Sequence, residues 1–396
     1  MSYRFSARTG WDLGESGFAA AIREARAAGR RLVDLTVSNP TVCGFSYDAE
    51  TILKPLASVG ALTYDPDPRG MRAAREAVAE YYAERQDDGA GVDPDAVVLT
   101  TSTSEGYGYL FRLLCDAGDE VLVAQPSYPL FDFLADLEDL RLRSYPLFYE
   151  PGGKGGWWVD FAELEKRVGP KTKAVVVVHP NNPTGHATGV AERERLQEIC
   201  ARHGLALIVD EVFLDYPLTE KRLPSFAVGP HLVLTFVLSG MSKIAGLPQM
   251  KVGWIVGLGP EELRREAMGR LEVIADTFLS MNAPVQLALP AWLAGRRGVQ
   301  GQILERVRGN LACAQRSGVE VLRVEAGWSA ILRLPQTGGD VAERLLREVG
   351  VVVHPGSFYG IAESGRVVVS LLGPGDEFAQ GLERIVHGQK LNHGSY

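Results

Sequence analysis

A lysine in the second half of the chain has a sequence context that suits covalent chemistry. Lys243 lies in the segment LSGMSKIAGLPQMKVGW (238–254), directly after an apolar run that predicts a buried strand. Burial lowers the pKa of a lysine, because the charged form loses its hydration, and the neutral amine forms an imine with a carbonyl compound. Since most lysines are exposed, an ordinary loop lysine is the alternative interpretation. Neighbouring motifs are therefore needed to support Lys243 as a nucleophile.

Three further polar motifs follow predicted strands. HPNNPTG (179–185) ends the apolar run KAVVVVH, Asp210 ends the run ALIVD, and LTTSTSE (99–105) leads from a strand into a helix. The carboxyl ends of parallel strands form the edge where α/β sheets bind ligands, and the free N–H groups of a helix start suit a phosphate. Each motif also has an ordinary interpretation as a turn, a buried ion pair or a helix cap.

The elements that must hold these groups predict an α/β fold. Apolar runs indicate strands at 97–101, 120–124, 141–145, 173–179, 206–211, 233–239 and 251–256, and helical patterns separate several of them. This alternation predicts a largely parallel sheet with right-handed crossovers. We expect a three-layer domain with a mostly parallel seven-stranded sheet over residues 46–284. Residues 1–45 and 285–396, with short strands near 321, 329, 351 and 366, are expected to form a smaller α+β domain from both chain ends.

Composition excludes several other classes of protein. The chain has 396 residues, is 46% hydrophobic and has a net charge of −8, which fits a globular protein and disfavours nucleic acid as a partner. No apolar run resembles a transmembrane span or a signal-peptide core, so no membrane partner and a cytoplasmic location are expected. The four cysteines are scattered without a CxxC pair, and no metal site is expected. Phosphate-loop, GxSxG, HExxH and dinucleotide-binding motifs are missing from the sequence.

In this order, the motifs resemble the class I/II aminotransferases, the aspartate aminotransferase-like enzymes of fold type I that use pyridoxal 5'-phosphate. The resemblance extends over nearly the whole chain. It implies that Lys243 forms the Schiff base with the cofactor and that Asp210 keeps the pyridine nitrogen protonated. It also implies that Asn182, in NPTG, donates to the phenolic oxygen of the ring, and that Tyr128, in QPSYPLF, stacks on the ring face. Lys243, Asp210 and Tyr128 are the implied catalytic residues.

The resemblance implies further cofactor contacts from residues that match the family's motifs: Ser102, Thr103, Ser104, Phe213, Ser239, Ser242, Lys251 and Tyr64. Tyr64, in LTYDPDPRG, matches a tyrosine that reaches the phosphate from the other subunit, so a homodimer is implied. Arg366, in ESGRVVVS, matches the arginine that binds the substrate α-carboxylate through its planar fork. Ser38 and Asn39 match the segment that lines the substrate pocket.

Four positions depart from the family pattern. Phe213 stands where most relatives have a tyrosine, Gly240 replaces a serine, Lys251 replaces an arginine and Thr103 stands where glycine is common. Losing the tyrosine hydroxyl leaves Asn182 as the donor to the ring oxygen, so we expect the imine of Lys243 to have a raised pKa. Lys251 offers a point charge in place of a fork, which favours looser phosphate binding.

The resemblance predicts a transaminase that moves an amino group from an α-amino acid to a 2-oxo acid through the imine at Lys243. A pyridoxal-phosphate-dependent cysteine-conjugate or cystathionine β-lyase is the alternative, since it needs the same residues. A cofactor-binding regulatory protein is less favoured, because the chain begins almost at once with the aminotransferase-like arm. The substrate side chain is not identified; candidates for its pocket are Trp11, Asn39, Tyr64, Arg69, Phe213 and residues 279–282.

Overall fold

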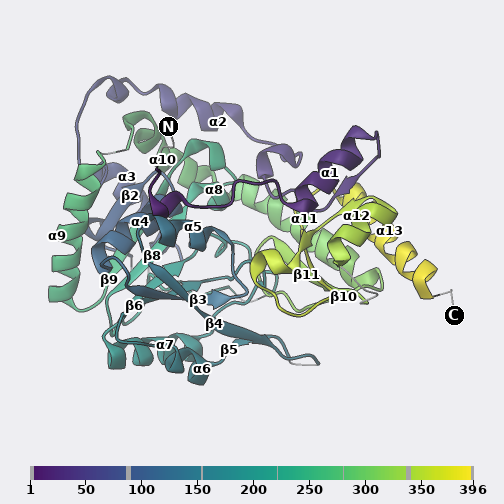
Figure 1. The fold of residues 1–396 in the computed structure, drawn as a ribbon. Helices are drawn as coiled ribbons and strands as arrows, with labels where there is room; N and C mark the ends of the chain where they lie inside the picture. Colours follow the sequence, from purple (N-terminus) through teal and green to yellow (C-terminus); the bar gives the residue numbers. More distant parts are fainter. Residues whose placement is uncertain are drawn as a thin grey trace.

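The computed structural model of the chain describes residues 4–85, 91–152, 155–220, 222–279, 281–335 and 340–393. It forms a large three-layer α/β domain and a smaller α+β domain beside it (Figure 1). The helices of the large domain are α2 (Ala49–Leu53), α3 (Arg72–Ala83), α4 (Thr103–Leu114), α5 (Leu130–Leu137), α6 (Phe161–Lys166), α7 (Val190–His203), α8 (Met241–Ile244), α9 (Glu261–Thr277) and α10 (Ala283–Gly295). Those of the small domain are α1 (Gly17–Ala27), α11 (Arg297–Arg316), α12 (Val341–Val349) and α13 (Gly375–His393).

The large sheet has eight strands in the order β2-β9-β8-β7-β6-β3-β4-β5. The strands from β8 to β4 run parallel, while β9 and the edge strand β5 run antiparallel to their neighbours. The mostly parallel α/β fold and all seven predicted strands are confirmed. Their bounds are β2 (Val97–Thr100), β3 (Glu120–Gln125), β4 (Arg141–Tyr149), β6 (Thr172–Val178), β7 (Ala206–Asp210), β8 (Thr235–Gly240) and β9 (Gly253–Leu258), with β5 (Trp157–Val159) in addition.

The predicted number of seven strands is wrong, because the short edge strand β5 makes the sheet eight-stranded. β4 continues to Tyr149, beyond the predicted end at residue 145, so its last residues have room for a partner. There β5 pairs with it antiparallel, with Leu147 opposite Val159. Three residues are too few for a period of two to be read from the sequence alone.

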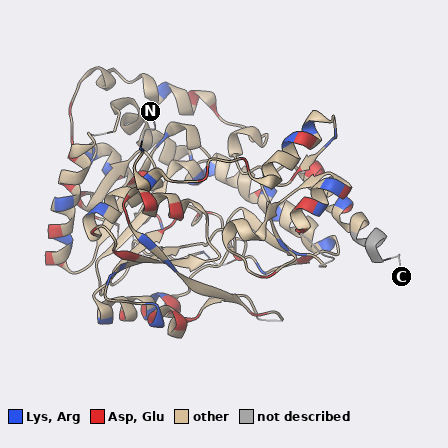
Figure 2. Ribbon diagram, viewed as in Figure 1, with Lys and Arg blue, Asp and Glu red and all other residues tan. Residues whose placement is uncertain are grey.

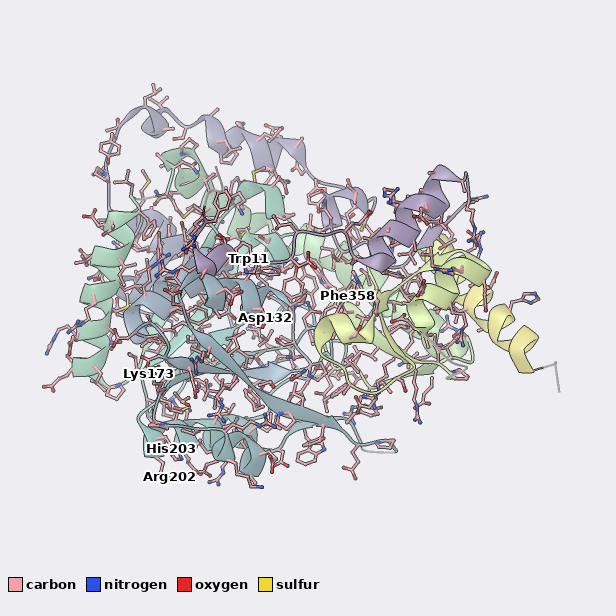
Figure 3. The ribbon with its side chains drawn as sticks, viewed as in Figure 1. Trp11, Asp132, Lys173, Arg202, His203 and Phe358 are labelled. Atoms are coloured by element: carbon pink, nitrogen blue, oxygen red, sulfur yellow. The ribbon has the colours of Figure 1, made fainter. Side chains whose placement is uncertain are left out.

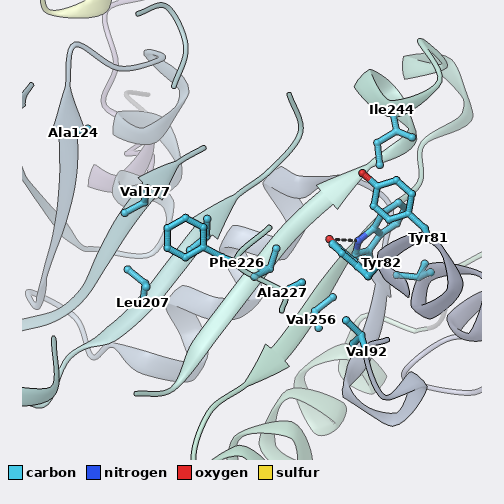
Figure 4. Packing of buried hydrophobic residues seen from close by; sticks show 14 of the residues in the cluster. Tyr81, Tyr82, Val92, Ala124, Val177, Leu207, Phe226, Ala227, Ile244 and Val256 are labelled. Atoms are coloured by element: carbon cyan, nitrogen blue, oxygen red, sulfur yellow. Dashed lines mark hydrogen bonds between the residues drawn. The ribbon is translucent and has the colours of Figure 1, made fainter. Parts of the chain in front are cut away.

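Buried side chains alternate between the two faces of the large sheet. Val177, Leu207 and Val256 face one layer, where they pack with Tyr81 and with helices α3, α6, α7 and α10 (Figure 4). Tyr82 in this layer accepts a hydrogen bond from the indole N–H of the buried Trp254, at 3.1 Å. The opposite face packs against α4, α5 and α9. Coverage on both faces explains why the strand sequences are apolar at nearly every position.

The small domain is built from both ends of the chain, with its own apolar core. β1 (Val33–Asp34) from the N-terminal segment pairs with β12 (Val351–Val352) near the C-terminus. The other small-domain strands form a sheet in the order β10-β11-β14-β13, comprising β10 (Glu320–Val321), β11 (Ser329–Arg333), β14 (Arg366–Ser370) and β13 (His354–Pro355). The domain boundaries predicted at residues 46 and 285 stay a prediction.

The N-terminal arm runs over the large domain before it reaches α1 (Figure 1). The indole N–H of Trp11, labelled in Figure 3, donates to Asp136 at 2.7 Å, and its ring packs edge-on against Phe133 of α5. Acidic and basic residues alternate along the outer helices, α9 and α12 among them (Figure 2). Within the described ranges, every helix is too short or too polar to cross a membrane.

Candidate active site

The two domains meet at a cavity of about 370 Å³ at the carboxyl edge of the large sheet. We call its two sides the large-domain wall and the small-domain wall. The large-domain wall consists of Ser102, Thr103, Ser104, Tyr107, Tyr128, Leu130, Phe131, Val178, Asn182, Asp210, Val212, Phe213, Gly240, Ser242, Lys243, Pro248, Lys251 and Val252. The small-domain wall consists of Thr36, Ser38, Trp328, Ser329, His354, Tyr359, Val368, Val369 and Ser370.

Lys243 lies in the short helix α8, directly after β8, and its side chain reaches the cavity between two aromatic rings. The Nζ atom is 5.2 Å from the ring centre of Trp328 and 5.7 Å from that of Phe213. Burial lowers the pKa of Lys243, while the charge of Asp210 acts in the opposite direction. The hydroxyl of Tyr216 donates to the Lys243 carbonyl at 2.5 Å and fixes the backbone at this point. Lys243 is therefore not an exposed loop lysine, and its surroundings favour the neutral, nucleophilic amine.

Asp210 ends β7 and holds a buried carboxyl group. The Tyr107 hydroxyl donates to one carboxylate oxygen and the Val212 N–H to the other, each at 3.1 Å. Burial raises the pKa of Asp210 to about 6, and the two donors together with Lys243 oppose this rise. A cationic group placed against this carboxylate would stabilise its charged form further. Asp210 can therefore hold a protonated ring nitrogen.

The start of α4 forms a cradle for an anion. Ser102 caps the helix by accepting the Glu105 N–H at 3.1 Å, and the Glu105 carboxylate accepts the Thr101 N–H at 2.6 Å. Ser102, Thr103 and Ser104 line the cavity at this helix start, where the helix dipole favours negative charge. Lys251 lines the same cavity with a backbone φ of 53°, in the left-handed region that few lysines adopt. A phosphate fits this set of donors.

The departure at Gly240 has a steric cause. A Cβ atom on Gly240 would lie 2.8 Å from the Val252 carbonyl oxygen and 3.0 Å from the Gly253 Cα atom, because the two glycines face each other across β8 and β9. Gly253 in turn lies against the first turn of α4, where a Cβ atom would be 3.2 Å from the Thr103 nitrogen. A serine at position 240 does not fit unless β9 moves.

Most of the predicted site residues are brought together at the cavity. They are Ser38, Ser102, Thr103, Ser104, Tyr128, Asn182, Asp210, Phe213, Ser242, Lys243 and Lys251. Tyr128 is 48% exposed and lines the cavity. The Oδ1 atom of Asn182 is buried, without a hydrogen-bond partner among the described atoms. A buried polar atom of this kind is costly unless a ligand completes it.

Three other predicted residues lie away from the cavity. The Ser239 hydroxyl is fully buried and is directed at the Glu211 carbonyl, 3.5 Å away, because alternate residues of β8 face opposite sides. The Asn39 side chain caps the turn that follows it by accepting the Thr41 N–H at 3.1 Å. Tyr64 is 80% exposed, so its predicted contact with the phosphate requires a second subunit.

Arg366 is not among the residues that line the cavity. It begins β14, whereas the cavity is lined by Val368 and Ser370 further along the same strand. Its assignment to the substrate carboxylate stays a prediction. Its guanidinium pairs with Glu363 at 3.2 Å and lies near the Trp157 ring, beside a separate surface hollow.

Two side-chain pocket candidates from the sequence are also engaged elsewhere. Arg69 bonds to Glu272 and to the backbone of Asp95, and Trp11 is held by α5. Of residues 279–282, Leu279 is 70% exposed, and Ser280 lies outside the described residues.

Several cavity residues were not found from the sequence: Thr36, Tyr107, Trp328, Ser329, His354, Tyr359, Val368 and Ser370. His354 follows the buried run VVV, so the rule that a polar residue at a strand end marks a ligand edge would have found it. Tyr107 lies within α4, and its contact with Asp210 depends on how α4 packs over the sheet. No local sequence signal predicts that contact.

Comparison with known proteins connects this geometry to one family. A family model described as "Aminotransferase class I and II" matches residues 44–385. An alanine aminotransferase of Mycobacterium tuberculosis is 30% identical over 284 residues, which are 70% of this chain and 64% of that protein. A glutamate-pyruvate aminotransferase of Haemophilus influenzae is 28% identical over 282 residues, covering 70% of this chain and 67% of that protein. The chain thus matches about two thirds of the length of these two relatives.

Two further matches extend over almost the whole chain. The LL-diaminopimelate aminotransferase of Dehalococcoides mccartyi is 27% identical over 377 residues, 92% of this chain and 93% of that protein. A solved alanine aminotransferase structure from Pyrococcus furiosus aligns with a TM-score of 0.86 at 22% identity, covering 98% of this chain and all of that one. The structural likeness shows that the fold is shared.

Proposed function

Because the chain belongs to the class I and II aminotransferase family, we propose that it is a pyridoxal-phosphate-dependent transaminase. It would move an amino group from an α-amino acid to a 2-oxo acid as part of amino acid metabolism, in the cytoplasm. The observation that carries this proposal is the convergence of Lys243 and Asp210 in one cavity with the α4 start. A buried amine, a buried carboxylate and an anion cradle are the three groups that a pyridine aldehyde phosphate requires.

The residues present fit this cofactor. Ser102, Thr103, Ser104 and Lys251 would hold its phosphate, and Asp210 would hold the ring nitrogen. Asn182 lines the same cavity, and its amide N–H group would donate to the ring oxygen. Tyr128 would cover one face of the ring. When bound, the cofactor supplies an electron sink for the carbanion that forms at the substrate Cα.

Lys243 would serve as the base and acid of the reaction. Its neutral Nζ atom would take up the proton from the substrate Cα, hold it within the cavity and give it back in the second half of the transfer. Burial keeps this amine neutral enough to accept the proton. The Trp328 and Phe213 rings beside Nζ limit the access of water and keep the amine near the reacting atoms.

We further propose a homodimer, with Tyr64 reaching the phosphate of the second subunit. The segment 53–64 exposes large apolar side chains, namely Leu53, Val59, Leu62 and Tyr64, each more than half exposed. Apolar groups gathered in this way are typical of a subunit interface. Sedimentation of the full chain should give a dimer, and Leu62→Glu should shift it towards monomer while lowering cofactor retention. A monomeric wild type with full activity would contradict the proposal.

One experiment tests the function directly. The purified chain is loaded with pyridoxal phosphate, reduced with borohydride and digested, and the modified peptide should contain Lys243. The loaded protein is then mixed with single amino acids and its visible absorbance is followed. Conversion to the pyridoxamine form, with release of the 2-oxo acid, supports a transaminase. Release of ammonia and pyruvate from a cysteine conjugate, without the pyridoxamine form, would show a β-lyase instead.

A further inference from the structure

The two aromatic rings beside Lys243 come from different domains. The Nζ atom lies over the Trp328 ring, 5.2 Å from its centre, and over the Phe213 ring at 5.7 Å. The two rings meet edge to face, with their centres 5.4 Å apart. Trp328 belongs to the small-domain wall, whereas Lys243 and Phe213 belong to the large-domain wall. The nearer of the two rings is therefore supplied by the domain that does not carry the lysine.

Hydrogen bonds and packing fix Trp328 relative to Lys243. The N–H of Gly327 donates to the Tyr216 carbonyl at 2.9 Å, and the Tyr216 ring packs edge-on against the indole with the centres 4.9 Å apart. The Tyr216 hydroxyl donates to the Lys243 carbonyl at 2.5 Å. Tyr216 is thus bonded to the backbone on both sides, so the indole and the lysine keep their places although they come from different domains.

The proposed reaction requires a charged form of Lys243 inside the cavity. When Nζ takes the proton from the substrate Cα, the amine becomes an ammonium group and the electron pair of the C–H bond stays with the substrate. Burial disfavours this ammonium group, because it has lost its hydration, while the charge of Asp210 favours it. Asp210 is the one carboxylate among the described residues that line the cavity, and under the proposed function it faces the ring nitrogen. The ammonium group therefore needs a further source of stabilisation.

An aromatic face can supply this stabilisation. It attracts a cation that lies within about 6 Å of the ring centre, tryptophan more strongly than phenylalanine, and the attraction is larger where water is excluded. A neutral amine gains little from the same contact, so the rings favour the state in which Nζ holds the proton. An interaction that strengthens as the proton moves lowers the barrier to moving it.

We propose that Trp328 is a positioning residue for the proton transfer, whose ring face holds the Lys243 ammonium group and so favours movement of the proton from the substrate Cα to Nζ. This inference rests on the proposed transaminase function and adds a residue of the small domain to it. The indole is 2% exposed, and its N–H has no hydrogen-bond partner among the described atoms. Its contact with Lys243 is therefore made by the ring face.

Fluorinated tryptophans at position 328 test the ring face while keeping the shape of the side chain nearly unchanged. Each fluorine withdraws electron density from the ring, so tetrafluorotryptophan attracts a cation only weakly. The loaded full chain is mixed with alanine, and the visible absorbance is followed over a single turnover. The rate constant should fall stepwise from tryptophan through the monofluoro and difluoro forms to the tetrafluoro form, by about tenfold in total. The dissociation constant of alanine should change by less than about twofold.

The pKa of Lys243 supplies a second readout that does not depend on turnover. In the chain loaded with pyridoxamine phosphate, Nζ is free, and competitive acetylation at a series of pH values followed by peptide mapping gives its pKa. Loss of the attraction for the ammonium group should lower this pKa by about one unit between tryptophan and tetrafluorotryptophan. The other titratable side chains that line the cavity are the same in every sample: Tyr107, Tyr128, Asp210, Lys251, His354 and Tyr359.

Trp292 is the matched control. It is also 2% exposed, but it lies in α10, where its indole N–H donates to the Ile52 carbonyl at 2.9 Å. Tetrafluorotryptophan at position 292 should leave the rate and the pKa of Lys243 unchanged. Trp328→Leu removes the ring and should slow the reaction at least as much as tetrafluorotryptophan does at position 328. If this variant does not fold, the fluorinated series still decides the question.

The outcomes separate this inference from the proposed function. An equal rate and an equal pKa of Lys243 for tryptophan and tetrafluorotryptophan at position 328 would overturn the role of Trp328. A rate that rises with fluorination would also overturn it, because fluorine makes the indole N–H a stronger hydrogen-bond donor. If the loaded chain converts amino acids to oxo acids in either case, the transaminase proposal still holds. If no amino acid changes the visible absorbance and reduction does not label Lys243, the proposed function itself fails.

Discussion

The two walls of the cavity differ in how they are built. The polar groups of the large-domain wall come from the ends of parallel strands and from the start of a helix. The course of the backbone therefore places these positions at one edge of the sheet, whichever side chains occupy them. The large-domain wall carries both lysines and the buried carboxylate of Asp210. The small-domain wall takes its residues from short antiparallel strands and from the segments beside them, and it presents hydroxyls, aliphatic groups, aromatic rings and His354.

This difference indicates a division of tasks. Under the proposed function, cofactor chemistry needs fixed charges, and the large-domain wall would supply them from a sheet that is covered on both faces. Substrate choice needs groups that can differ from one relative to another, and the small-domain wall supplies these from strand ends, where a shift of two residues replaces one side chain with another on the same face. Substitutions on the two walls should therefore have effects of different size and kind.

The largest effect is expected on the large-domain wall, at Lys243. Lys243→Ala should lower kcat by about 10⁴-fold or more, since both the covalent link and the proton carrier are lost. Stopped-flow absorbance with alanine measures the loss, and addition of a small external amine should restore part of the rate. Activity within tenfold of wild type would refute the assignment of Lys243.

Asp210→Asn should have the second largest effect on activity. Loss of a preorganised charge at the ring nitrogen should lower kcat by about 100-fold to 1000-fold, with little change in the amount of cofactor bound. Equilibrium dialysis of the cofactor and steady-state rates test the two parts. A variant that binds cofactor normally and keeps its kcat would show that the ring nitrogen is not held here.

Tyr107→Phe should have an intermediate effect through Asp210. The Tyr107 hydroxyl stabilises the charged carboxylate, so its removal raises the pKa of Asp210 above its present value of about 6. Loss of one hydrogen bond corresponds to about one pH unit. The acid limb of the rate profile should therefore move to higher pH by that amount. An unchanged limb would show that Tyr107 does not act on the reaction.

Phe213→Tyr tests a departure within the large-domain wall. The added hydroxyl can donate to the ring oxygen of the cofactor, which should lower, by up to about one unit, the pH at which the visible absorbance of the loaded protein changes. A spectrophotometric pH titration of both proteins measures this. If wild type already titrates at low pH and the variant matches it, Asn182 alone is a sufficient donor.

Arg366→Gln should have the smallest effect while the arginine keeps its place outside the cavity, and it tests the predicted contact with the substrate carboxylate. Arg366 pairs with Glu363 there, so KM for an amino acid should change by less than about twofold. A large rise in KM for Arg366→Gln would mean that the arginine moves into the cavity when substrate binds.

The two walls were also unequally predictable from the sequence. The strands of the large sheet are long apolar runs, and the polar residues that end them, Asn182 and Asp210, necessarily meet at one edge. In β14 the run VVV carries no alternation of polar and apolar residues, so the sequence contains no sign of which end reaches the cavity. The place of Arg366 relative to the cavity could therefore not be predicted from the sequence, and the contact of Tyr107 depends on packing that no motif encodes.

The facing glycines of β8 and β9 constrain the order in which this chain can acquire substitutions. Serine at position 240 is excluded while the Val252 carbonyl oxygen lies 2.8 Å from the place of its Cβ atom, and Gly253 is held in turn by the first turn of α4. Substitutions at position 240 and in β9 are therefore epistatic. A serine at position 240 is harmful in the present chain, but it is tolerated once substitutions in β9 have moved that strand. Laboratory evolution of the cofactor site should reach position 240 late, after compensating changes near residues 252 and 253.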